Sequence, residues 1–130
     1  MAATFRNYAI GMSEYQRLNP VVGSFSQRLM RAIGVTRDEV VELVDAIRRP
    51  SEFLDELSDV LHSVVVSAFM MLPRMLHEMP VCWGFVFFLS GGRTAWKHGK
   101  RFGEYGCVRS MRHCGKDHVC FNRKLAEESK

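Results

Sequence analysis

The residues of this sequence best suited to chemistry are four acidic side chains that occur as two pairs. Glu39 and Glu42 form one pair, and Glu56 and Asp59 form the other. Residues three apart are neighbours on one face of an α-helix, so each pair would form a carboxylate cluster. If the two helices pack antiparallel, the four charges face one another and repel unless a cation neutralises them. A hard divalent cation such as Mg²⁺, which prefers oxygen ligands, meets this need.

The first acidic pair is expected on a helix that ends near Arg48. Gly34 is expected to stop a preceding helix, and Thr36 then begins a capping box with Glu39 three residues after it. Pro50 would end the helix. In an alternative interpretation Glu39 only caps its helix, because single acidic pairs are common on solvated helix faces.

The second acidic pair is expected on a helix from Ser51, a suitable N-cap, to about Leu72, before Pro73. With a helical turn of about 100° per residue, its apolar residues form one stripe: Phe53, Leu54, Leu57, Val60, Leu61, Val64, Val65 and Ala68. A second face begins polar, at Glu56 and Asp59, and becomes apolar further along. A helix with two such faces is typical of one that lies between partners in a bundle or an oligomer.

The other segments also favour helices. Residues 13–33 are amphipathic but interrupted by Pro20 and Gly23, which predicts two short helices or one kinked helix. Residues 81–89 form an apolar run that fits either a buried turn of helix or a strand. After a glycine-containing break, residues 94–102 fit a further helix.

The composition is typical of a single globular domain. Of 130 residues, 47% are hydrophobic and 25% charged, which excludes a disordered tail, a collagen-like fibre and a disulfide-dense scaffold. We predict an all-α bundle at residues 1–106 and a basic Cys- and His-containing tail at residues 107–130. No apolar run reaches the roughly 18 residues of a membrane span. The N-terminus lacks the pattern of a secretory signal. We therefore expect a cytoplasmic protein with reduced cysteines and no membrane partner.

Charge is distributed unevenly along the chain. Residues 38–59 hold eight acidic against two basic residues, a net charge of −6. Residues 93–124 hold nine basic against two acidic residues, a net charge of +7. This division suggests that one part holds cations and the other holds an anion, although both could be solvated helix faces.

The acidic segments resemble a known signature. The letters DEVVE at residues 38–42, a gap of 13 residues, and ELSD at residues 56–59 are similar to the EExxE…ExxD motif of the MazG-like all-α nucleoside triphosphate pyrophosphohydrolases. The resemblance is good over residues 36–66 and loose over residues 24–105. Asp38 stands where the family often has Glu, and Ser58 where it often has Gly. Ser58 is harmless if its side chain points outward.

The resemblance implies a reaction and a site. Members of this superfamily cleave the α–β phosphoanhydride of a nucleotide to a monophosphate and pyrophosphate. By carry-over, Mg²⁺, which Mn²⁺ can replace, would be held by four carboxylates: Glu39, Glu42, Glu56 and Asp59. Glu39 would also accept the proton of the attacking water. The phosphates would be held by three bases: Lys97, Lys100 and Arg101.

An oligomer is expected on two grounds. The apolar runs at residues 64–72 and 81–89 exceed what a subunit of this size easily buries. The resembled superfamily also forms dimers or tetramers, with sites near the subunit interfaces. We therefore expect a homodimer or homotetramer that completes the site.

The tail contains a second possible metal site. Its potential zinc ligands are Cys107, His113, Cys114, His118 and Cys120. Their spacing matches no common zinc finger, and the alternative is three reduced thiols and two surface histidines.

A different class of function is the alternative to the enzyme. The basic C-terminal third, with aromatic residues among its bases, is also typical of a small helical module that binds nucleic acid or a protein. Such a module has no use for four clustered carboxylates, whereas a nucleotide hydrolase does.

Overall fold

The computed structural model describes residues 2–18 and 22–105, and over these residues all regular secondary structure is helical. This confirms the predicted all-α class. The predicted zinc ligands lie outside the described residues, as does the boundary between bundle and tail near residue 106. Within the described part of the chain, no helix combines the length and the apolar character needed to cross a membrane.

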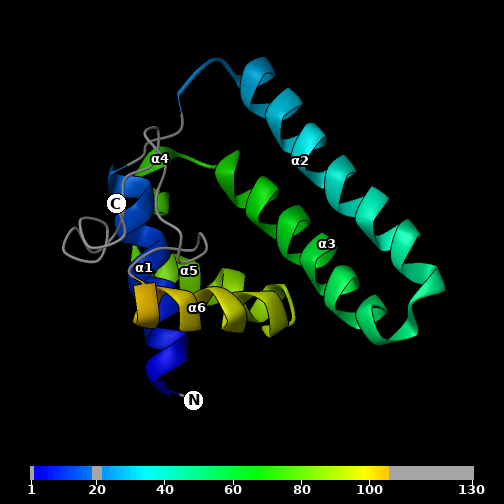
Figure 1. Cartoon of the computed structure of the whole chain (residues 1–130). Coiled ribbons are helices and arrows are strands. Elements are labelled where there is room, and N and C mark those ends of the chain that lie inside the picture. Colours follow the sequence, from blue (N-terminus) through cyan, green and yellow to red (C-terminus); the bar gives the residue numbers. More distant parts are fainter. Residues whose placement is uncertain (1, 19–21, 106–130) are drawn as a thin grey trace.

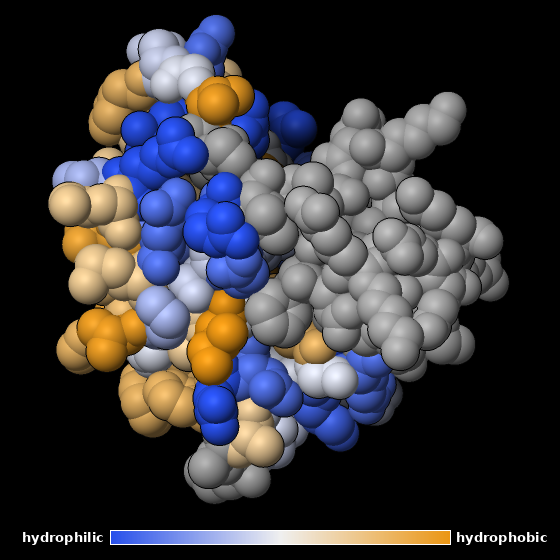
Figure 2. All heavy atoms as spheres, turned by 90° about the vertical axis from the view of Figure 1, so that its left-hand side faces the viewer, coloured by the Kyte–Doolittle hydropathy of each residue, from blue (hydrophilic) through white to orange (hydrophobic). Residues whose placement is uncertain are grey.

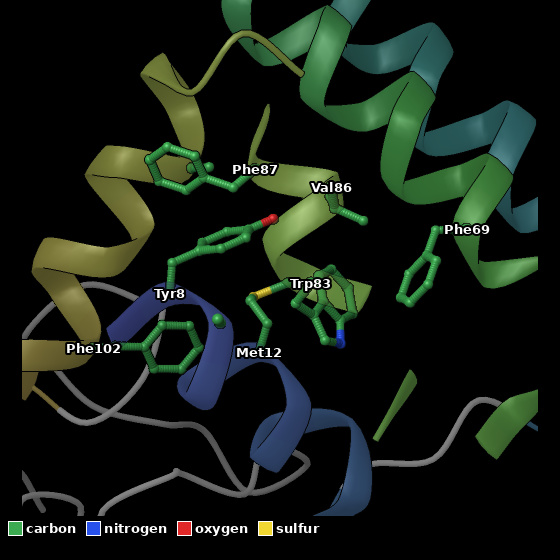
Figure 3. Close-up of a cluster of buried hydrophobic side chains, with 9 residues drawn as sticks. Tyr8, Met12, Phe69, Trp83, Val86, Phe87 and Phe102 are labelled. Carbon is green, nitrogen blue, oxygen red and sulfur yellow. The ribbon is translucent and has the colours of Figure 1, made fainter. Parts of the chain in front are cut away.

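Helices α1 (Ala2–Leu18), α5 (Pro80–Leu89) and α6 (Arg93–Tyr105) form the body of the molecule (Figure 1). Their shared core contains Tyr8, Met12, Trp83, Val86, Phe87 and Phe102, together with Phe69 (Figure 3). Aromatic rings in this core meet edge to face, for example Phe69 and Trp83 with centroids 4.8 Å apart.

Two glycines allow α6 to pack closely across α1. A Cβ atom on Gly11 would lie 2.4 Å from the Phe102 ring, and one on Gly99 would lie 2.3 Å from the carbonyl oxygen of Thr4. Any larger residue at either position would push the two helices apart. The close approach matters for function because α6 carries the predicted phosphate-binding bases.

Helices α2 (Phe25–Asp45) and α3 (Pro50–Met70) lie side by side and extend away from this body (Figure 1). A short 3₁₀ helix, η1 (Ala46–Arg48), connects them, and the short α4 (Arg74–His77) follows α3. The α2 helix has no buried residue. Most of its packing in the described chain is therefore against α3.

The structure corrects the predicted start of the first acidic helix. The α2 helix begins after Ser24, whose hydroxyl accepts from the Gln27 backbone N–H while the Gln27 side chain accepts from the Ser24 N–H. This capping box replaces the one predicted at Thr36, and the helix continues through Gly34. The hydroxyl of Thr36 instead lies 3.2 Å from Ser63 Oγ on α3. A glycine inside a helix costs only about 1 kcal/mol, which a well-capped helix tolerates.

The ends of α3 also differ from expectation. Pro50 begins α3 instead of ending the preceding helix, because its fixed φ suits the first turn. Ser51 therefore lies inside the helix and does not cap it. The helix ends at Met70, where the Arg28 guanidinium donates to the carbonyl oxygens of Met70 and Leu72. This contact ties the start of α2 to the end of α3.

Elsewhere the predictions were partly right. The segment at residues 13–33 is shared by two helices, as one alternative proposed, but neither is short: α1 begins at Ala2, and α2 continues to Asp45. The apolar run at residues 81–89 is helical, and the helix predicted at residues 94–102 is α6.

The two faces of α3 have unexpected environments. Leu54 and Val64, on the apolar stripe, are 57% and 48% exposed in the single chain. Ser58, His62, Ser63 and Phe69 are buried. The side of α3 that packs inside this chain therefore carries both polar and apolar residues.

Candidate metal and phosphate site

Helices α2 and α3 bring the predicted acidic residues together. Glu39 lies on α2, Glu56 and Asp59 lie on α3, and one carboxylate oxygen of each lies within 4.8 Å of the others. Glu42, one turn after Glu39, is exposed, and its charge contributes to the raised pKa of both Glu39 and Glu56. Three of the four predicted ligands therefore form the cluster, and Glu42 lies near them. Asp38 lies outside it, with its exposed side chain near Arg37.

The cluster strongly affects the protonation of Glu39. Burial, together with the neighbouring charges of Glu42, Asp59 and Glu56, raises the pKa of Glu39 from 4.5 to about 7. Burial and the charges of Glu42 and Asp59 also raise the pKa of Glu56. Without a cation, the cluster therefore retains a proton near neutral pH.

Two oxygens in the cluster indicate that a cation fits there. Glu39 Oε2 and Glu56 Oε2 are buried and have no hydrogen-bond partner among the described residues. Buried carboxylate oxygens normally have partners, and leaving one without a partner costs free energy. Oxygen ligands of this kind suit Mg²⁺ or Mn²⁺.

Helix α6 contacts Asp59 from the other side. Thr94 Oγ1 donates to Asp59 Oδ1 at 2.7 Å, and Lys97 Nζ lies 3.4 Å from the same oxygen. Arg93 forms a 2.8 Å ion pair with Asp55, which lowers the pKa of that carboxyl group. These contacts join the first turns of α6 to the acidic half of α3.

A pocket of about 340 Å³ opens beside the cluster. Its lining residues are Val35, Glu39, Asp59, His62, Ser63, Val66, Ser67, Thr94, Lys97, His98 and Arg101. Two of the three predicted phosphate-binding bases, Lys97 and Arg101, therefore face the same space as the acids. Lys100 is exposed on α6 and does not line this pocket.

The sequence reasoning missed two histidines in the pocket wall. The His62 and His98 rings lie edge to face with centroids 4.9 Å apart, and Tyr8 Oη lies 2.9 Å from His62 Nε2. Burial lowers the pKa of His62 to about 3 and that of His98 to about 4, so both rings are neutral. His62 follows Asp59 by three residues and could have been found on the same helix face. No sequence signal indicated His98.

Ser58 also has an unexpected position. It points inward, is 6% exposed, and its hydroxyl lies 2.7 Å from Thr94 Oγ1. The condition that its side chain points outward is therefore not met. The serine connects α3 to α6 at the edge of the site.

Comparisons of the chain with protein-family models, curated proteins and solved structures find no match. The inference of function therefore depends on the residues and their arrangement.

Proposed function

We propose that the protein is a Mg²⁺-dependent nucleotide pyrophosphohydrolase that cleaves the α–β phosphoanhydride of a nucleoside triphosphate. The observation that carries this proposal is a cluster of three carboxylates, Glu39, Glu56 and Asp59, beside a pocket that is also lined by the cationic Lys97 and Arg101. A triphosphate and its metal need both kinds of charge, on opposite sides of one space. The MazG-like arrangement, with α2 and α3 as an antiparallel pair, belongs to the same proposal.

The carboxylates would have two roles, cation binding and proton acceptance. Glu39, Glu42, Glu56 and Asp59 would hold Mg²⁺, or Mn²⁺ in its place. When bound, the cation neutralises phosphate oxygens and lowers the pKa of the attacking water. We assign the acceptance of that water's proton to Glu39, because its carboxyl group lines the pocket together with Asp59.

The bases of α6 act on the phosphates. Lys97 and Arg101 line the pocket and donate to phosphate oxygens, which orients the chain of phosphates relative to the carboxylates. Lys100 contributes positive potential from outside the pocket. His62 and His98 form a neutral wall that adds no further charge to the site.

A second copy of the chain would complete this site. An apolar groove of about 540 Å³ runs between α2 and α3, lined by residues that include Val41, Val64 and Ser67. Ser67 also lines the candidate substrate pocket, so a partner seated in the groove would lie at the edge of the site. Monomers rarely expose apolar surfaces this extended. We therefore propose a homodimer or homotetramer.

The activity is tested by incubating the protein with each of the common nucleoside and deoxynucleoside triphosphates, with and without Mg²⁺. We expect monophosphate and pyrophosphate as products, only when metal is present. Release of a diphosphate and inorganic phosphate would place the cleavage at the wrong bond.

Carboxamide variants test whether the cluster is responsible. Glu39→Gln, Glu56→Gln and Asp59→Asn each remove a charged ligand and should lower the rate by at least about 100-fold. Asp38→Asn is the matched control, because Asp38 lies outside the cluster. If all three cluster variants hydrolyse nucleotides normally, the proposal is wrong. A salt-dependent nucleic-acid gel shift without hydrolysis would favour the binding-module alternative.

A further inference from the structure

Three polar side chains form a buried chain of hydrogen bonds between α3 and α6. Thr94 Oγ1 lies 2.7 Å from Asp59 Oδ1 and 2.7 Å from Ser58 Oγ, and the Thr94 backbone N–H donates to Ser58 Oγ at 3.0 Å. Thr94 is 4% exposed and Ser58 is 6% exposed. Water therefore has little access to compete for these bonds.

The direction of each bond follows from the chemistry of the groups. An ionised carboxylate only accepts, so the single hydroxyl proton of Thr94 is donated to Asp59. The hydroxyl of Ser58 must then donate to Thr94 Oγ1. The chain runs Ser58 to Thr94 to Asp59, and successive bonds of this kind strengthen one another.

This arrangement restricts the Asp59 carboxylate. Thr94 and Lys97 both occupy Oδ1, which fixes the rotation of the group and leaves Oδ2 to serve a cation. Thr94 also lies on the helix that carries the pocket bases Lys97 and Arg101. The Thr94 hydroxyl thus links Asp59 on α3 to the helix that carries the pocket bases.

We propose that Thr94 is a positioning residue that orients Asp59 for cation binding, and that Ser58 acts on the site only through Thr94. This inference rests on the proposed function, because it takes Asp59 as a metal ligand. It goes beyond that function in assigning roles to two residues outside the acidic cluster.

The test measures Mn²⁺ binding to the full-length protein without nucleotide, from the electron paramagnetic resonance signal of free Mn²⁺. Thr94→Val keeps the shape of the side chain but removes the hydroxyl, and should weaken Mn²⁺ binding by about 10- to 100-fold, the usual effect of losing a partner of a metal ligand. Thr94→Ser restores the hydroxyl and should bind within about threefold of the wild type. Equal losses in Thr94→Val and Thr94→Ser would overturn the proposal.

The role of Ser58 is tested by a double-mutant cycle. Ser58→Ala should weaken Mn²⁺ binding less than Thr94→Val does, and the loss in the double variant should be smaller than the sum of the two, because the Ser58 hydroxyl donates to the hydroxyl that valine removes. Additive losses would show that Ser58 acts independently. Thr94→Val could fail to fold. In that case, a Ser58→Ala variant that binds Mn²⁺ as tightly as the wild type would be enough to reject the proposed chain of hydrogen bonds.

A matched control separates positioning from general stability. Ser90→Ala removes another buried hydroxyl, the one that donates to the Phe87 carbonyl oxygen in α5, at a position outside the Asp59 network. It should lower the unfolding temperature about as much as Thr94→Val but leave Mn²⁺ affinity within about twofold. Equal losses of affinity in both variants would mean that Thr94 is merely structural.

The outcomes also separate this inference from the proposed function. If the wild type binds Mn²⁺ but hydrolyses no nucleotide, the function is wrong, and the Thr94 series still decides the positioning role. If the wild type hydrolyses nucleotides and Thr94→Val binds Mn²⁺ normally, only the positioning role is wrong. A wild type that binds no Mn²⁺ overturns both.

Discussion

At the scale of single residues, the acidic cluster combines two different environments for its carboxylates. Burial and the neighbouring acids raise the pKa of Glu39 to about 7, and its Oε2 has no hydrogen-bond partner among the described residues. Asp59 instead accepts from Thr94 and contacts Lys97. Two kinds of carboxylate in one pocket suit a site in which one group exchanges a proton while another remains fixed.

The raised pKa of Glu39 predicts that pH controls both metal binding and stability. Below pH 7 a cation must displace the proton of Glu39, so apparent Mg²⁺ affinity should increase as pH rises to about 7 and then level off. Calorimetry in buffers of different ionisation enthalpy should detect the released proton. The Glu39→Gln variant, which cannot bind this proton, is the control. If the Mg²⁺ affinity of the wild type depends on pH no more than that of the variant between pH 5 and 7, Glu39 does not carry the raised pKa.

The raised pKa of Glu39 also determines how the free energy of unfolding changes with pH. Between the ordinary carboxyl pKa of 4.5 and about 7, the folded metal-free protein retains a proton that the unfolded chain has lost. The contribution of Glu39 to the free energy of unfolding therefore falls as pH rises through this window. His62 and His98 have the opposite effect, because their lowered pKa values make the free energy of unfolding fall as pH falls below 6.5. The contribution of Glu39 is therefore measured as the difference in denaturant unfolding between wild type and Glu39→Gln at each pH.

At the scale of the elements, α2 is a continuous helix whose stability depends on its start and on α3. Ser24 and Gln27 cap its first turn, and the Thr36–Ser63 contact fixes it to α3 one turn before Glu39. The geometry of the acidic cluster therefore depends on an unbroken helix through Gly34.

This continuity is tested by Gly34→Ala. A Cβ atom at position 34 would meet no atom within 4 Å, and the residue lies inside the helix. The alanine should stabilise the protein by about 0.5–1 kcal/mol, because glycine loses more backbone entropy in a helix. Thermal unfolding measures the effect. A loss of stability would indicate that the helix breaks at Gly34, as the sequence alone had suggested.

At the scale of the whole molecule, apolar surface is the main feature that function has yet to explain. The α5 helix has no charged residue, and Phe85, Phe88 and Leu89 are well exposed. The face shown in Figure 2 mixes hydrophobic and hydrophilic residues. The apolar groove between α2 and α3 is continuous, through Val64 and Ala68, with a second apolar groove beside α5. A second copy of the chain would cover part of this surface.

The oligomer is tested by placing a charge in the groove. Val64→Lys adds a cation at a half-exposed position, which a single chain tolerates but an apolar interface does not. Light scattering coupled to size-exclusion chromatography should show a smaller assembly. Met75→Lys, at an exposed position outside both grooves, is the control and should leave the mass unchanged. A monomeric wild type would refute the proposed dimer or tetramer.

The sequence by itself determined the helical class and the pairing of the acids. Both depend on local geometry, since residues three apart must share a helix face whatever the rest of the chain does. Helix ends were less predictable: Thr36 fits a capping box in the sequence, but its hydroxyl contacts Ser63 on α3, and Ser24 caps the helix instead.

The tertiary structure alone decided which groups meet the acids. Thr94 and Lys97 reach Asp59 from positions 35 and 38 residues later in the chain, through the packing of α6 against α1 and α3. It also decided which side of α3 is buried: Ser58, His62 and Phe69 are buried, whereas Leu54 and Val64 of the apolar stripe are exposed. Neither fact has a signature in sequence spacing, because contacts between distant segments depend on how whole helices pack.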